Sequence, residues 1–199
     1  VGKGWKLSIQ ESIVEKDSSD GSTWYIYNDA DGTELYFYYD SDKGGYISED
    51  GYDLIITKDE VRQEYTMSDS FGNTKKFNSA GKLYEIKDMH GNKRTLYYDN
   101  GRVSSIAYSP YQGISTTHLN FTYNSNNALS RITNSKTGEY VTFASSATYD
   151  GTANSSYSGF LRTITYSNGI GSCSYEYFSS GRLKRATDTA TGSQIVYSY

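Results

Sequence analysis

The chain has 199 residues, among them 22 Tyr, 19 Gly, 2 His, 1 Pro and 1 Cys. Its 19 basic residues against 23 acidic residues give a formal net charge of −4, and no segment gathers the basic residues typical of nucleic-acid or membrane-surface binding. One cysteine excludes an internal disulfide and a cysteine-rich zinc site, and no apolar run approaches the ~20 residues that span a bilayer. We expect no nucleic-acid partner and no membrane insertion of this segment.

Short aromatic and β-branched runs alternate with Gly, Asn and Asp clusters, which predicts strands joined by hairpin turns. The first predicted hairpin joins residues 24–27 to residues 35–39 through an Asp- and Gly-containing turn. The segment 58–64 lacks an apolar stripe at helical spacing, so we predict a turn between strands there. Alternating patterns predict further strands at 118–123, 163–166 and 174–177, and the low-complexity stretch 145–156 predicts a loop.

A repeat with five copies follows this first part. Each copy has a turn residue, a second residue, an aliphatic residue, two variable residues and a second small or aliphatic residue, and successive copies begin about 20 to 32 residues apart. The paired aliphatic positions are Leu83 and Ile86, Val103 and Ile106, Leu129 and Ile132, Leu161 and Ile164, and Leu183 and Ala186. An aromatic strand precedes each copy and a second turn follows it, so the predicted unit is strand, turn, strand, turn.

Two-stranded hairpins are marginally stable alone in water, so we expect these units to join edge to edge. The predicted fold is all-β, with consecutive antiparallel hairpin repeats in one continuous, curved or spiralling sheet. In a regular strand, two residues three positions apart face opposite sides. The paired aliphatic residues therefore require a bulge, a sheet edge or burial on both faces, and the sequence leaves these alternatives open.

The segment from Tyr97 through Tyr98, Asp99, Asn100, Gly101 and Arg102 to Val103 resembles the tyrosine-aspartate (YD) repeat of the Rhs family. The segments from Tyr123 to Leu129 and from Tyr177 through Gly181 and Arg182 to Leu183 are similar, with Asn124 and Ser179 in place of the Asp, so these copies are degenerate. Residues 2–7 and 25–37 are similar to the segment that often introduces such repeats. We divide the single β-repeat domain 1–199 into introductory strands (1–66) and degenerate repeats (67–199).

The resemblance implies part of a spiralling β-shell that encloses a toxic C-terminal domain in some relatives and serves cell adhesion in teneurins. We therefore expect a non-enzymatic structural segment of a bacterial secreted or cell-surface protein. Its expected partners are the remaining repeats and the effector domain of the parent chain, because a chain beginning at Val1 is expected to be a piece of a longer protein. The one proline, Pro110, lacks the family's self-cleavage motif, so no self-cleavage is expected.

The alternative function is a cell-surface adhesin or carbohydrate-binding module. Tyr and Trp stack on sugar rings and form rigid contact surfaces, which makes Trp5, Trp24, Tyr36 and Tyr38 the candidate ligand contacts. The competing interpretation is that cross-strand aromatic pairs simply stabilise the sheet. A protein or glycan on the cell surface is the partner that the alternative implies.

Other chemistry has weaker support in the sequence. The Asp-rich turn 28–34 would need acidic ligands at positions 27 and 38 for a calcium loop, and both are Tyr. His90 and His118 lie in different repeats, and Cys173 lies in a predicted strand without a nearby His or Asn to activate it. A pair of carboxylates in a groove, as in a glycosidase, is not excluded by the sequence. We expect no catalytic residue, no metal and no cofactor.

Overall fold

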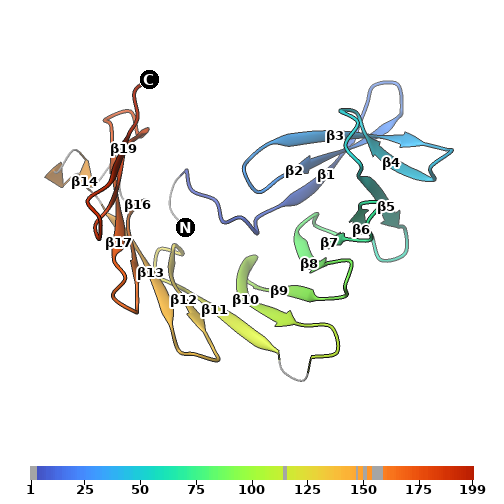
Figure 1. The fold of residues 1–199 in the computed structure, drawn as a ribbon. Coiled ribbons are helices and arrows are strands. Elements are labelled where there is room, and N and C mark those ends of the chain that lie inside the picture. The colour runs from blue at the N-terminus through green and yellow to red at the C-terminus, as the bar shows by residue number, and fades with distance from the viewer. Residues whose placement is uncertain (1–3, 114–115, 147, 150–151, 154–158) are drawn as a thin grey trace. The chain divides into compact units, whose positions relative to one another are not determined.

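The computed structural model describes residues 4–113, 116–146, 148–149, 152–153 and 159–199, and every regular element in this part of the chain is a β-strand (Figure 1). Six residues of the predicted loop 145–156 lie outside the described part of the chain, and the other six (145–146, 148–149 and 152–153) lie in strands, so the loop prediction is wrong for them. The strands are β1 (Ser12–Asp17), β2 (Thr23–Asn28), β3 (Glu34–Asp40), β4 (Gly45–Ser48), β5 (Ile55–Asp59), β6 (Glu64–Ser68), β7 (Thr74–Phe77), β8 (Leu83–Lys87), β9 (Lys93–Asp99), β10 (Arg102–Ser109), β11 (Thr117–Tyr123), β12 (Leu129–Asn134), β13 (Tyr140–Ser146), β14 (Thr148–Tyr149), β15 (Thr152–Ala153), β16 (Phe160–Tyr166), β17 (Ser172–Tyr177), β18 (Leu183–Asp188) and β19 (Gln194–Val196).

Consecutive strands pair antiparallel, and the prediction of an all-β sheet built from hairpins is confirmed. Seventeen strands belong to one sheet, and β14 and β15 form a separate pair. The first predicted hairpin is present as β2 and β3, with Trp24 opposite Tyr38 and Ile26 opposite Tyr36. Its turn is closed by two main-chain hydrogen bonds between Asp29, Gly32 and Thr33. Of the segment 58–64 that we predict as a turn, residues 60–63 form the turn between β5 and β6, whereas residues 58, 59 and 64 belong to these strands.

The chain forms two compact units, Lys6–Thr117 and Val1–Trp5 with His118–Tyr199. Residues 66 and 67, where we divide introductory strands from repeats, both lie in β6, and that division stays a prediction. No membrane-spanning helix is found among the described residues.

In the unit Lys6–Thr117, strand β1 forms hydrogen bonds along both of its edges. All six of its residues pair with β2 on one side. On the other side, the Ile13 amide donates to the Gly81 carbonyl at 2.9 Å, the Leu83 amide donates to the Glu11 carbonyl at 3.3 Å, and Ser12 forms a bridge with Lys82. The start of β1 therefore connects β2 to the first repeat.

This unit has a true apolar core. Tyr25, Phe37, Ile56, Phe77 and Leu83 are each at most 2% exposed. They come from five different strands and face inward, because alternate residues of a strand point to the same side of a sheet. Burial of such large side chains supplies the main stabilisation of the unit.

Candidate functional site

A β-bulge lies at the same position in all five repeats. In each copy the strand register shifts at the residue that directly follows the first aliphatic position, so no residue of the neighbouring strand stands directly opposite it in the register. The five bulge residues are Tyr84, Ser104, Ser130, Arg162 and Lys184. The extra residue restores the alternation, so both aliphatic residues of a copy face the same side of the sheet. Of the three alternatives left open by the sequence, the structure has the bulge.

The two aliphatic positions differ in burial. Leu83, Val103, Leu129 and Leu161 are at most 6% exposed, and Leu183 is half-buried. At the second position only Ile106 is buried, whereas Ile86, Ile132, Ile164 and Ala186 are half-buried. The first position is buried in four of the five copies, and we call this position the anchor of the repeat.

An aromatic residue faces that anchor in four copies. Phe77 lies opposite Leu83, Tyr98 opposite Val103, Tyr123 opposite Leu129 and Tyr177 opposite Leu183. In the remaining copy, Ser145 occupies the place opposite Leu161. These aromatic–aliphatic pairs across neighbouring strands are a recognised source of sheet stability.

Two of these tyrosines also connect one repeat to the preceding one. The Tyr98 hydroxyl donates to the main-chain carbonyl of Leu83 at 2.6 Å, and the Tyr177 hydroxyl donates to the carbonyl of Leu161 at 2.6 Å. The accepting carbonyl belongs in both cases to the residue just before a bulge. We call these contacts the repeat clips.

The turn residues of the repeat give the hairpins their geometry. Gly81, Gly101 and Gly181 have positive φ values, and Asn127 takes the same backbone conformation with φ of 61° in the third copy. Asn is among the few other residues that tolerate this region. Asp99 and Arg102 face each other across the tight Asn100–Gly101 turn, and Arg182 lies with its guanidinium carbon 5.0 Å from the ring centre of Tyr199.

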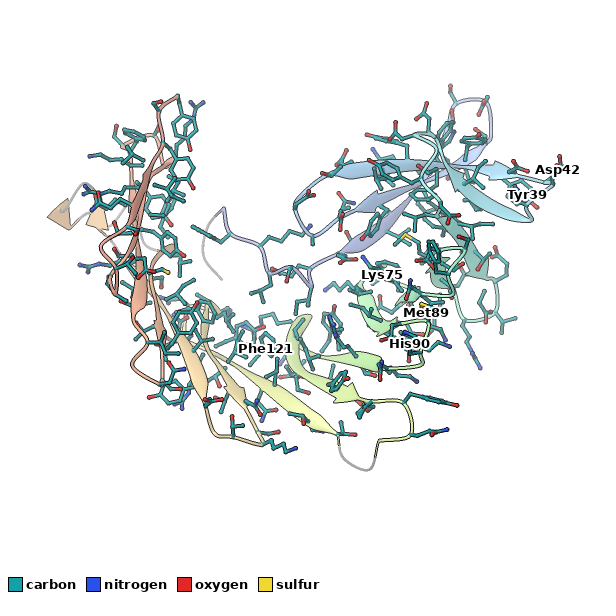
Figure 2. All side chains as sticks on the ribbon, in the orientation of Figure 1. Tyr39, Asp42, Lys75, Met89, His90 and Phe121 are labelled. Carbon is teal, nitrogen blue, oxygen red and sulfur yellow. The ribbon has the colours of Figure 1, made fainter. Side chains whose placement is uncertain are left out.

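The turns at the other ends of the strands are connected by polar side chains. The Asn73 side-chain oxygen accepts from the Met89 amide at 2.9 Å, and the Asn92 side-chain oxygen accepts from the Tyr111 amide at 3.0 Å. Met89 lies beside His90 in the turn between β8 and β9 (Figure 2). Each of these Asn side chains thus joins its own turn to the next turn at the same end of the strands.

The unit Val1–Trp5 with His118–Tyr199 uses hydroxyl side chains for the same purpose. The Ser135 hydroxyl accepts from the His118 amide at 3.1 Å, the Ser167 hydroxyl from the Tyr140 amide at 2.9 Å and the Thr189 hydroxyl from the Ser172 amide at 3.0 Å. His118 therefore makes this contact with its main-chain amide, near the start of β11.

Three of the four candidate ligand contacts come together on the face of β1–β3 that points away from the core residues Tyr25 and Phe37. Trp24 lies opposite Lys16 on β1 and opposite Tyr38 on β3, and Ile26 lies opposite Tyr36. The Trp24 and Tyr38 ring centres are 5.9 Å apart. Tyr36 and Tyr38 are each 39% exposed, and Trp24 is half-buried.

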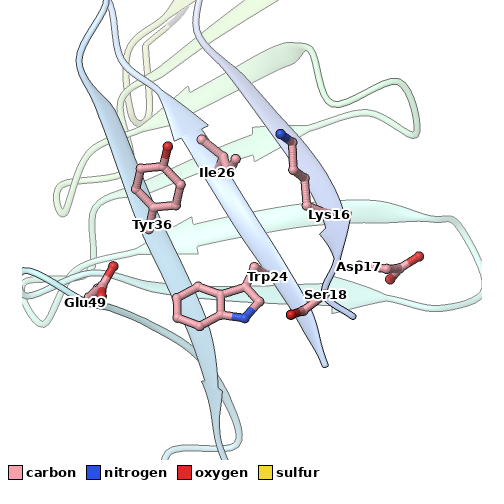
Figure 3. A pocket seen from close by; sticks show the side chains of 7 residues that line it. All are labelled: Lys16, Asp17, Ser18, Trp24, Ile26, Tyr36 and Glu49. Atoms are coloured by element: carbon pink, nitrogen blue, oxygen red, sulfur yellow. The ribbon is translucent and has the colours of Figure 1, made fainter. Parts of the chain in front are cut away.

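A groove of about 380 Å³ lies on this face, which we call the aromatic groove (Figure 3). Its lining residues are Lys16, Asp17, Ser18, Trp24, Ile26, Tyr36 and Glu49. Figure 3 shows Lys16 and Glu49 on opposite sides of the Trp24 and Tyr36 rings. Lys16 and Glu49 were not identified from the sequence, since their place at the groove depends on strand register and on the loop after β4.

Trp5, the fourth candidate, lies in the other unit and has a different environment. Its indole N–H donates to the Tyr177 hydroxyl at 2.8 Å, and its ring lies edge-on to Tyr175 with centres 4.7 Å apart. Trp5 therefore adds to the repeat clip that Tyr177 makes with Leu161, and its polar atom is already occupied.

Two carboxylates on or beside β1, the buried Glu11 and the exposed Glu15, are each paired with a lysine and a tyrosine. Glu11 lies 2.7 Å from the Lys75 ammonium and accepts from the Tyr27 hydroxyl at 2.6 Å. Burial, with the Glu11 hydrogen bond second, raises the pKa of Tyr27 well above its ordinary value. This cluster holds the start of β1 against β2 and β7.

The second carboxylate, Glu15, lies 2.8 Å from the Lys58 ammonium and accepts from the Tyr65 hydroxyl at 2.9 Å. The hydrogen bond from Lys58 lowers the pKa of Glu15, and the same hydrogen bond raises the pKa of Lys58. Both clusters satisfy their charges internally, which is the arrangement of structural ion pairs.

The Asp-rich turns use their carboxylates for main-chain contacts. Asp31 accepts from the Thr33 amide at 2.8 Å, and Asp40 accepts from the amides of Asp42 and Lys43 at 2.8 and 3.1 Å. Cys173 is a half-buried free thiol on β17. Within the part of the chain that the structure describes, no three His, Cys, Asp or Glu residues are grouped to hold a metal ion.

Comparison with solved structures returns bacterial toxin components. The chain is similar to the TcdB2–TccC3–Cdc42 structure, with 12% identity and a TM-score of 0.41 over 88% of this chain and 12% of that one. It is also similar to the Photorhabdus luminescens Tc holotoxin pore with a TccC3 mutation, with 14% identity and a TM-score of 0.41 over 89% of this chain and 10% of that one. No family model and no curated protein matches the sequence.

Proposed function

We propose that this chain is a non-enzymatic structural segment of a bacterial secreted or cell-surface YD-repeat protein. In this proposal it forms part of a wall that encloses or displays a separate effector domain, and its partners are the other repeats and the effector of the parent chain. The proposal needs no cofactor. The sequence resemblance to the YD repeat and the hairpin architecture support it.

The repeat clips are the observation that carries the proposal. Each clip joins the tyrosine of one repeat to a main-chain carbonyl of the previous repeat, and both hydrogen bonds are 2.6 Å long. Contacts of this kind depend on the neighbouring repeat and on no ligand. Hydrogen bonds between neighbouring repeats suit a repeat sheet that extends over a long distance, because the stability of such a sheet depends on the interfaces between neighbours.

The polar clusters of the unit Lys6–Thr117 fit the same role. Glu11 and Glu15 each pair with a lysine and a tyrosine of the same unit, so both carboxylates take part in contacts within the fold. A catalytic carboxylate pair would instead face a cleft where substrate can reach it.

The test is the sequence of the parent reading frame on both sides of this chain. The proposal expects further hairpin repeats with the same aliphatic pairs, followed by an unrelated terminal domain. A reading frame with an anchor to the cell wall and no effector domain would contradict the enclosing role and favour an adhesin.

A further inference from the structure

Three polar groups at the rim of the aromatic groove differ from those of the two ion-pair clusters in the same unit. Lys58 and Lys75 are both paired with carboxylates. Among the described residues, no hydrogen bond or ion pair is made by the Lys16 ammonium, the Trp24 indole N–H or the Glu49 carboxylate. The groove therefore presents two donors and one acceptor that the fold itself does not use.

The floor of the groove is apolar and held in place from three strands. Ile26 is 7% exposed and lies between Val14 and Tyr36 in the cross-strand register. Trp24 contacts Tyr38, and β2 is paired on both sides, so the indole has little freedom to move. A flat ring held by its neighbours loses little conformational entropy when a ligand binds.

The charges at the rim select the class of ligand. Lys16 lies on one side of the rings and Glu49 on the other, with Asp17 also at the rim (Figure 3). A polyanion would meet the two carboxylates and a polycation would meet the lysine, so neither is matched. Hydroxyl groups both donate and accept, which suits a rim with ammonium, indole N–H and carboxylate together.

The volume of the aromatic groove and its apolar floor narrow the class of ligand further. About 380 Å³ falls in the range of small-molecule sites. The C–H face of a sugar ring is apolar, and its hydroxyls lie around the edge, so the face matches the Trp24 and Tyr36 rings while the edge meets the rim. We propose that the aromatic groove binds a pyranose ring of a neutral polysaccharide, a binding activity that goes beyond the structural role.

The two tryptophans allow a direct measurement. In the variant Trp5→Phe, Trp24 is the only indole in the chain, so its fluorescence reports the groove alone. The probes are cellohexaose and mannohexaose as neutral oligosaccharides, with a heparin hexasaccharide as the polyanion. The proposal expects a saturable change of Trp24 emission with at least one neutral probe and none with heparin. Calorimetric titration of the unsubstituted chain with the same probes is the control, because it shows whether a loss of binding in Trp5→Phe comes from a folding defect of that variant.

Variants then locate the site. Trp24→Leu keeps an apolar side chain without the flat ring, and Lys16→Ala removes a rim donor. Both are expected to weaken binding at least about tenfold in calorimetry, with unfolding midpoints close to that of the unsubstituted chain. Tyr108→Ala is the matched control, because Tyr108 is 43% exposed in the same unit and does not line the groove.

Three results would overturn the proposal. They are the absence of saturable binding to every neutral glycan on an array, equal binding by folded Trp24→Leu, and stronger binding of a proline-rich peptide than of any sugar. None of these results bears on the structural role, which the parent reading frame tests separately.

Discussion

The Tyr177 hydroxyl donates to the main-chain carbonyl of Leu161 at 2.6 Å, and Tyr98 makes the same contact with Leu83. The two pairs lie in different units but occupy corresponding places in their repeats. The tyrosine faces the anchor residue of its own hairpin, and its hydroxyl reaches the anchor of the previous hairpin. One side chain thus serves two repeats.

Loss of this hydroxyl should destabilise the protein. Tyr177 is 4% exposed, so Tyr177→Phe leaves a buried carbonyl of Leu161 without its donor and removes the acceptor of the Trp5 indole. We expect a loss of about 1–3 kcal/mol in the free energy of unfolding, measured by urea denaturation. The control is Tyr166→Phe, because Tyr166 is 46% exposed. Equal stability of the two variants would contradict the clip.

The two aliphatic positions of a repeat should differ in the cost of truncation. Leu83 is fully buried, whereas Ile86 is half-buried. We expect Leu83→Ala to lower the free energy of unfolding by about 2–5 kcal/mol and Ile86→Ala by clearly less. Leu129→Ala should behave like Leu83→Ala, because Leu129 is 2% exposed. Unchanged melting of the two leucine variants would show that these positions are not anchors.

A glycine at the contact with β1 should be sensitive to any side chain. Gly81 has φ of +69°, and a Cβ added there would lie 1.9 Å from the Ile13 carbonyl oxygen. Gly72 has φ of +90° with nothing within 4 Å of such a Cβ. Gly72→Ala should cost about 1–2 kcal/mol for the left-handed backbone alone, and Gly81→Ala should cost more because of the clash. Thermal melting of both variants measures the difference, and equal melting temperatures would contradict the contact.

Stability should fall in alkaline solution because two half-buried tyrosines have raised pKa values. Burial raises the pKa of Tyr84 and of Tyr175 to about 12, against about 10 in an unfolded chain. The folded state therefore keeps protons that the unfolded state loses, so this stabilisation is complete below about pH 10 and is lost as the pH rises through about 12. Urea midpoints measured from pH 9 to 12 should decrease, and Tyr84→Phe should reduce the slope. A flat profile would contradict this burial.

The hairpins and the repeat could be predicted because both depend on local pattern. Alternation identifies a strand such as residues 118–123, and Asp and Gly identify the turn between Trp24 and Tyr36. The convergence of Trp24 and Tyr38 also follows from alternation once a hairpin is assumed. The place of Trp5 does not, because its contacts with Tyr175 and Tyr177 connect residues about 170 positions apart.

The bulge and the clips required the structure. Three-residue spacing between Leu83 and Ile86 shows that regular alternation fails but does not show how. The clip joins Tyr98 on β9 to Leu83 on β8, and the turn between these strands lies between the two residues in the chain. Their separation in sequence therefore depends on the length of that turn. Lys16 and Glu49 reach the aromatic groove through strand register and a loop, which neither composition nor periodicity specifies.

The most direct test of the structural role is electron cryomicroscopy of the full-length parent protein. The account predicts that these residues form part of a continuous β-sheet wall, with other repeats paired to them and a separate effector domain enclosed or displayed by that wall. A map in which residues 1–199 form an isolated domain, with no repeat paired to them and no effector domain beside them, would contradict it.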